Sequence, residues 1–88
     1  ISFIVMGDRN ATGNFTEFER YASALEQMTV ANFSGRPHWG KMHWSDARAL
    51  RDAYGDEAWE SFAAQRQAMD PKGVFLNDFL RSQLGIAP

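Results

Sequence analysis

Ten residues between two helical patterns read Gly35-Arg36-Pro37-His38-Trp39-Gly40-Lys41-Met42-His43-Trp44. Two glycines and one proline interrupt any helical period here, which favours a loop or an irregular strand. The same residues bring together two histidines, two tryptophans, an arginine and a lysine. They connect the elements on either side, and they are the first place to look for a functional site.

The segment before this stretch has the pattern of a long amphipathic helix over about residues 14–31. Its apolar residues recur at three- and four-residue spacing. They are Phe15, Phe18, Ala22, Leu25 and Met28. Asn14 is a suitable N-cap with Glu17 three residues later, and Gly35 can stop the helix.

The segment after the stretch predicts three further helices. They run from Ser45-Asp46 to Gly55, from Asp56 to Met69, and from Asn77 or Asp78 to Gly85. The second of them stops at Asp70-Pro71, because proline cannot continue a helix. The glycines end the other two.

The N-terminal residues Ile1–Met6 have high β-propensity and are followed by the turn formers of residues 7–10. They predict one strand, and residues 36–44 are the candidate for a second. The sequence therefore predicts an α+β fold with one or two strands. Because an isolated pair of strands leaves unpaired edges, the missing strands should come from a second copy or from the rest of a longer protein.

The composition excludes several classes of protein. The chain has 88 residues, a formal net charge of −2 and no cysteine. This charge speaks against a general nucleic-acid binder, and the lack of cysteine excludes disulfides and thiolate metal sites. The longest apolar run, Phe3–Met6, is far shorter than the roughly 20 residues of a membrane span. Since Ile1 starts an apolar run without a methionine, we expect a piece of a longer protein. The expected location is cytoplasmic.

Residues 36–44 allow two interpretations. In the functional one, Lys41 is a fixed positive charge in an anion or cofactor site, and in an extended chain it shares a face with Trp39 and His43. In the other, the stretch is a buried aromatic turn whose histidines bond the backbone and whose cations point to water. The five-residue spacing of His38 and His43 suits neither a helix face nor a strand face, so we expect no metal site.

Three asparagines, Asn10, Asn14 and Asn32, match the acceptor pattern for N-glycosylation. Each also has a structural interpretation, because Asn14 and Asn32 can cap a helix and Asn10 lies in a predicted turn. Both interpretations stay open from the sequence.

Two motifs resemble the C-terminal end of the FAD-linked sugar-lactone and alditol oxidases, which belong to the vanillyl-alcohol oxidase superfamily. Residues 35–41 match the family pattern G-[KR]-P-H-W-[GA]-K. Residues 69–80 contain the pattern L-D-P-x-G-x-F-x-N-x-[FYL], with Met69 in place of the leucine. Tyr54-Gly55 stands where the family more often has Tyr-Pro. The motifs occur in the family's order and spacing, and the resemblance covers essentially the whole chain.

The resemblance implies an enzyme with an N-terminal FAD-binding domain and an α+β cap domain. Residues 1–88 would be the C-terminal part of the cap, or substrate, domain and the return segment, without the FAD-binding domain. The implied reaction oxidises a CH–OH group of a sugar lactone or polyol. Hydride passes to flavin N5, and oxygen or another acceptor reoxidises the flavin.

By the same resemblance, Lys41 corresponds to a lysine close to the flavin and the substrate oxygens, and His38 to the histidine beside it. Both are predicted as catalytic and cofactor-binding residues. The implied partners are the rest of the flavoenzyme and a lactone or polyol substrate, and the 88 residues alone should be inactive. The alternative is a small non-enzymatic module whose aromatic stretch binds a protein.

The second motif also has an interpretation from its residue types. Pro71 stops the preceding helix, and Gly73 allows a backbone conformation closed to other residues. Phe75 and Phe79 can anchor the segment by burial. We therefore expect residues 70–77 to form a structural turn rather than a catalytic element.

Overall fold

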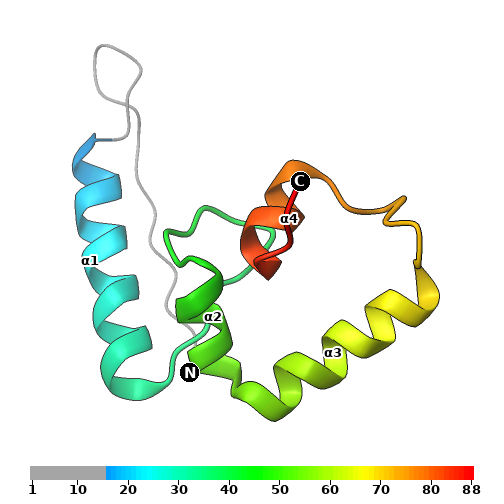
Figure 1. The fold of residues 1–88 in the computed structure, drawn as a ribbon. Coiled ribbons are helices and arrows are strands. Elements are labelled where there is room, and N and C mark those ends of the chain that lie inside the picture. The colour runs from blue at the N-terminus through cyan, green and yellow to red at the C-terminus, as the bar shows by residue number, and fades with distance from the viewer. Residues whose placement is uncertain (1–15) are drawn as a thin grey trace. The chain divides into compact units, whose positions relative to one another are not determined.

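A computed structural model describes residues 16–88, which form four helices joined by loops (Figure 1). The helices are α1 (Thr16–Phe33), α2 (Ala47–Tyr54), α3 (Asp56–Met69) and α4 (Asp78–Leu84). The chain divides into two compact units, Ile1–Trp44 and Ser45–Pro88. None of the helices in the described part of the chain combines the length and apolar character that crossing a membrane requires.

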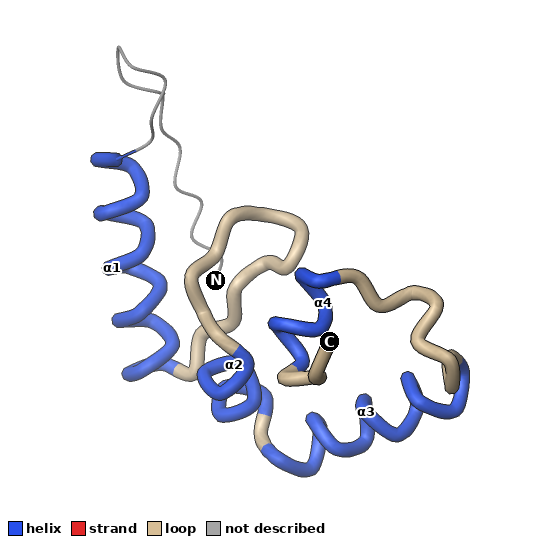
Figure 2. Tube along the Cα trace, turned by 45° about the horizontal axis from the view of Figure 1, so that its top comes forward, coloured by secondary structure: helices blue, strands red, loops and turns tan. Residues whose placement is uncertain are grey.

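The predicted α+β class is wrong for residues 16–88, because this part of the chain contains helices and loops but no strand (Figure 2). Residues 36–44, the candidate second strand, form a loop with a turn at Trp39 and Gly40. The physical reason is local: Pro37 has no N–H, and the N–H groups of Gly40 and Lys41 donate to His38 instead of to a neighbouring strand. The predicted strand at residues 1–6 lies outside the described residues.

The first unit contains α1, which ends two residues later than predicted. Asn32 takes part in the helix, where its side-chain amide donates to the carbonyl oxygen of Met28 at 3.0 Å. The helix ends where Ser34 adopts a left-handed conformation (φ 52°) and the Gly35 N–H donates to the Thr29 carbonyl at 3.0 Å. A Cβ on Gly35 would lie 3.1 Å from that carbonyl oxygen, so the close approach requires glycine.

The second unit contains α2, α3 and α4, whose predicted boundaries are confirmed. The Asp46 carboxylate caps α2 by accepting from the Ala49 N–H at 2.9 Å, and Asn77 caps α4 by accepting from the Leu80 N–H at 2.8 Å. Gly55 is the single residue between α2 and α3, with a φ of 89°. Because α2 contacts both α3 and α4, it is the central element of this unit.

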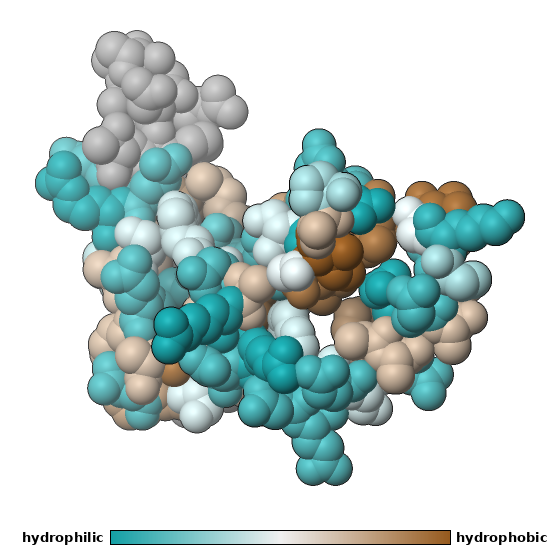
Figure 3. Space-filling model, in the orientation of Figure 1, coloured by the Kyte–Doolittle hydropathy of each residue, from teal (hydrophilic) through white to brown (hydrophobic). Residues whose placement is uncertain are grey.

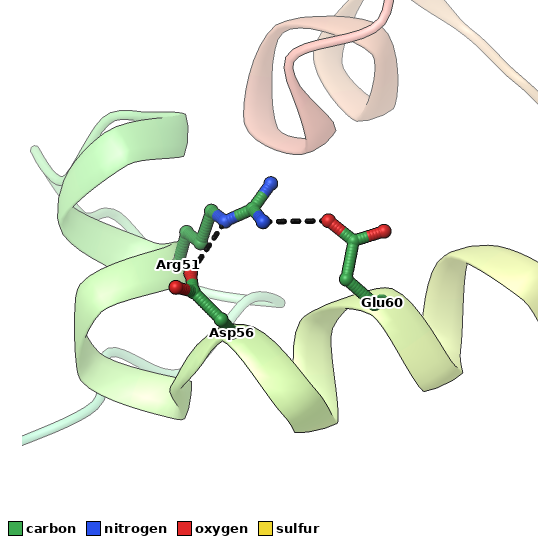
Figure 4. Close-up of polar contacts among 3 residues, drawn as sticks. All are labelled: Arg51, Asp56 and Glu60. Carbon is green, nitrogen blue, oxygen red and sulfur yellow. Dashed lines mark hydrogen bonds and ion pairs between the residues drawn. The ribbon is translucent and has the colours of Figure 1, made fainter.

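One arginine fastens the corner between α2 and α3 (Figure 4). The Nε of Arg51 donates to Asp56 Oδ1 at 2.7 Å, and its Nη2 donates to Glu60 Oε1 at 2.5 Å. The two carboxylates lie four residues apart, and therefore on one face of α3. The hydrogen bond to Asp56, followed by that to Glu60, raises the pKa of Arg51. Because all three side chains are substantially exposed, these ion pairs orient α2 relative to α3 but add little to the free energy of unfolding.

Little apolar surface is buried within the described residues. Only Ala22 on α1 and Leu50 on α2 are buried apolar residues there, and Leu50 alone is fully inaccessible. The largest exposed apolar side chains include Met69 and Phe75, which are 82% and 80% exposed. Helix caps and turn hydrogen bonds therefore determine much of this structure, with a small contribution from a core.

We predict that Leu50→Ala lowers the free energy of unfolding by about 2 to 5 kcal/mol, because it leaves a cavity on the helix that contacts both of its neighbours. Urea unfolding followed by far-UV circular dichroism measures the change. Gln65→Ala on the exposed surface of α3 is the control, with an expected change below about 0.5 kcal/mol. Equal unfolding midpoints for the two variants would show that Leu50 is not central.

Candidate functional site

Residues 38–41 form a closed turn in the loop that follows α1. The Lys41 N–H donates to the carbonyl oxygen of His38 at 3.1 Å, which is the hydrogen bond that closes a β-turn. The Gly40 N–H donates to Nδ1 of the same histidine at 3.0 Å. His38 therefore accepts hydrogen bonds from two backbone N–H groups of the turn, those of Gly40 and Lys41.

The hydrogen bond to Nδ1 fixes the tautomer of His38. A neutral imidazole carries a proton on one ring nitrogen and accepts at the other. Because Nδ1 accepts from Gly40, the proton of the neutral ring is on Nε2. The exposed His38 ring therefore presents an N–H donor at Nε2, while Nδ1 is committed to the turn.

The imidazole also explains the glycine in the motif. A Cβ on Gly40 would lie 3.0 Å from Cε1 and 3.3 Å from Nδ1 of His38. Gly40 is not among the residues with positive φ, so its backbone conformation does not require glycine. The close approach of the His38 ring is what favours glycine at this position.

Two side-chain donors of the turn, on Lys41 and Trp39, have no partner among residues 16–88. Lys41 is exposed, and its ammonium makes no ion pair with any residue in the range 16–88. Trp39 is half-buried, and its Nε1 is inaccessible without a hydrogen-bond acceptor among those same residues. Since buried N–H groups are nearly always paired, this one points to an acceptor supplied by another group.

The predicted sharing of one face by Trp39, Lys41 and His43 is wrong, because Trp39 and His43 are half-buried whereas Lys41 is exposed. The reason is the turn, which replaces the extended chain on which the alternation depended. Within residues 16–88, no three side chains of the kinds that hold metal ions form a cluster.

Glu26 is a contributor that sequence reasoning missed. Its carboxylate oxygen Oε2 accepts a hydrogen bond from the Trp44 N–H at 2.7 Å, which ties the end of the loop to α1. The sequence places Glu26 on the polar face of the helix, where several other charged residues have the same spacing. Only the path of the loop, which brings the Trp44 N–H to Glu26, distinguishes this glutamate from the others.

The second motif forms a turn built around Asp70. Its two carboxylate oxygens accept from the N–H groups of Val74 at 2.8 Å and Phe75 at 2.9 Å, and its carbonyl oxygen accepts from Gly73 at 3.1 Å. These hydrogen bonds, above all the one from Phe75, hold the pKa of Asp70 below its usual value. Gly73 has a φ of 67°, which favours glycine.

The expected structural turn is thus present, but its anchoring by apolar burial is wrong. Phe75 is 80% exposed and Phe79 is 46% exposed. Backbone hydrogen bonds to one carboxylate hold the turn together instead. The side-chain oxygens of Asp70 and Asn77 are all bonded to the backbone, which fits the expected structural role of these two residues.

The comparisons with known proteins concern nearly the whole chain. The family model described as D-arabinono-1,4-lactone oxidase matches residues 3–83. The L-gulono-1,4-lactone dehydrogenase of Mycobacterium tuberculosis is 48% identical over 69 residues, which are 78% of this chain and 15% of the relative.

Two further relatives also match over a large share of this chain but over a small share of their own length. The alditol oxidase of a Streptomyces species is 46% identical over 52 residues, which are 59% of this chain and 12% of the relative. The L-gulonolactone oxidase of Mus musculus is 40% identical over 51 residues, which are 58% of this chain and 11% of the relative. The chain thus spans only 11–15% of the length of these relatives. No solved structure matches the chain.

We predict that Gly40→Ala displaces the His38 ring and breaks the hydrogen bond to Nδ1, because the added methyl group would lie 3.0 Å from Cε1. Long-range ¹H–¹⁵N spectra that report the imidazole nitrogens should show the Nε2–H tautomer in the wild type. They should show a mixture of tautomers in the variant. An unchanged spectrum in Gly40→Ala would contradict the proposed contact.

We predict a pH-dependent effect of Asp70→Asn. Because the folded pKa of Asp70 is lowered, its carboxylate stabilises the fold above the ordinary pKa of about 4, and this contribution is lost as the pH falls through the lower folded value. The variant should melt below the wild type at pH 7, and the difference should shrink near pH 2. Asp52→Asn, an exposed carboxylate of α2, controls for the lost charge. A difference that is constant with pH would contradict this role.

Proposed function

The chain belongs to the D-arabinono-1,4-lactone oxidase family, and we propose that it is the C-terminal part of a flavoenzyme that oxidises a CH–OH group of a sugar lactone or polyol. Its relatives are named as a dehydrogenase and as oxidases, which favours an oxidoreductase over a non-enzymatic interaction module. The proposed cofactor is FAD. The FAD-binding domain and most of the cap domain belong, in this proposal, to the much longer polypeptide that the relatives represent.

The uncommitted donors of the turn at residues 38–41 support this proposal. An exposed ammonium on Lys41, a Trp39 N–H that has no acceptor among residues 16–88, and the Nε2–H of His38 together suit a partner that is rich in acceptor oxygens and nitrogens and carries negative charge. The pyrimidine edge of a reduced flavin has this character, and the neutral hydroxyl groups of a sugar supply further acceptor oxygens. Lys41 and His38 are therefore the residues of this chain that would hold the cofactor and substrate.

The proposed role of Lys41 is electrostatic. Bound FAD supplies the acceptor for the hydride and passes the electrons to oxygen or another acceptor. Lys41 holds a compact positive charge on a closed turn, where it can stabilise negative charge that develops during the oxidation. Because the backbone of the turn is already hydrogen-bonded, this charge needs little reorganisation when the reaction occurs.

The proposed role of His38 is to position and to donate. Its carbonyl oxygen and Nδ1 keep the turn closed, and its Nε2–H can donate to a substrate or cofactor oxygen. The 88 residues alone are expected to be inactive, since they supply these donors but no FAD-binding domain.

We predict that Lys41→Met slows flavin reduction in the full-length flavoenzyme by a factor on the order of 10² to 10³, which is typical for the loss of one preorganised electrostatic group. Lys41→Arg should rescue little, because a planar guanidinium does not occupy the space of an ammonium. Stopped-flow absorbance at saturating lactone or polyol measures the rate, with flavin content matched to the wild type.

Lys72→Met is the matched control for this experiment, since Lys72 is an exposed lysine of the Asp70 turn. It should reduce its flavin at the wild-type rate. Wild-type rates in both Lys41 variants would remove Lys41 from the chemistry. A full-length protein that binds no flavin would refute the proposed function as a whole.

A further inference from the structure

The second unit contains a groove that the proposed chemistry does not use. Its lining comes from α3 on one side and from α4 and the segment after it on the other, namely Trp59, Phe62, Ala63, Arg66, Leu84 and Ile86. Figure 3 shows strongly hydrophobic side chains gathered over α4, beside a hollow that separates them from α3. The groove is mostly apolar, with one charged group.

The wall formed by the end of α4 is held in place by hydrogen bonds. Gly85 adopts a left-handed conformation and ends the helix. The Ile86 N–H donates to the carbonyl oxygen of Arg81 at 2.8 Å, and the Arg81 guanidinium donates to the carbonyl oxygen of Ala87 at 2.9 Å. The groove is therefore preformed, although Phe62 on its other wall remains 54% exposed.

Arg66 gives the groove a specific polar requirement. Its Nη2 donates to Gln67 Oε1 at 2.9 Å, but its Nη1 is inaccessible and has no acceptor among the described residues. A buried cationic N–H without an acceptor is costly. Asp70 attracts this guanidinium electrostatically, yet both of its carboxylate oxygens accept from the turn backbone. The Arg66 guanidinium thus has no ion-pair partner among residues 16–88, and a carboxylate from another segment would supply one.

We propose that this groove binds a segment of the same flavoenzyme polypeptide, outside these 88 residues, that carries an apolar side chain next to an Asp or Glu. The apolar side chain covers Phe62, and the carboxylate pairs with Arg66. This inference rests on the proposed function, which makes the chain part of a longer enzyme.

Two observations favour this occupant over others. The chain spans only 11–15% of the length of its relatives, so most of such a polypeptide is available to cover it. Covalent attachment gives such a segment a high effective concentration. In addition, only Ala22 and Leu50 are buried apolar residues in the described part of the chain, so its apolar surfaces depend on an external cover.

Site-specific photo-cross-linking in the full-length flavoenzyme tests this occupant. Benzoylphenylalanine replaces Phe62 in one variant and Ile86, on the opposite wall, in a second. We expect an intramolecular cross-link from each position to a peptide outside the 88 residues that contains Asp or Glu. The same probe at Gln65, an exposed position of α3 outside the groove lining, should give little of this product.

A substitution at Arg66 tests the polar contact. Arg66→Met should reduce the yield of the cross-link from position 62, and Arg66→Lys should restore part of it. Three results would overturn the proposal: a cross-linked dimer, which indicates a second copy; a cross-link within the 88 residues; or no product from either wall. Flavin content and lactone or polyol oxidation are measured on the same samples, so failure of the groove proposal with an active flavoenzyme is distinguished from failure of the proposed function.

Discussion

His38 accepts two backbone hydrogen bonds from the turn that it begins, and the arrangement of the candidate site depends on them. They give Lys41 its place at the end of a closed turn and leave the imidazole with a donor at Nε2. They also favour glycine at position 40, because a Cβ there would lie 3.0 Å from the ring and the ring would have to move. The sequence His-Trp-Gly-Lys thus describes one local unit, in which the histidine shapes the backbone and the lysine carries the charge.

The rest of the described chain is organised in the same local way. Asp46 and Asn77 begin helices, Gly55 joins two of them, and Asp70 gathers the N–H groups of the turn that follows α3. These contacts fix the backbone within short segments and bury little apolar surface. A chain built in this way can present preformed turns while many of its apolar side chains stay exposed.

Features that depend on contacts within a few residues could be predicted from the sequence, whereas features that depend on distant contacts could not. The boundaries of α2, α3 and α4 and the cap at Asn77 were predictable, because caps, glycines and prolines act within a few residues. The role of Glu26 was not, since its partner Trp44 is 18 residues away and the intervening loop decides the contact. For residues 36–44 the sequence left a loop and an irregular strand open, and it could not decide between them because the N–H groups of Gly40 and Lys41 are bound by His38. The expected burial of Phe75 failed because burial depends on tertiary partners.

The central claim is that Lys41 supplies positive charge beside the flavin of the full-length enzyme, and the midpoint potential of that flavin tests it most directly. Removing a cation next to the cofactor disfavours the addition of electrons. The potential should therefore fall in Lys41→Met, on the order of 30 mV for each 1.4 kcal/mol of lost stabilisation in a two-electron couple. It should stay unchanged in Lys72→Met. Equal potentials in the wild type and Lys41→Met would place the lysine away from the flavin and contradict the account.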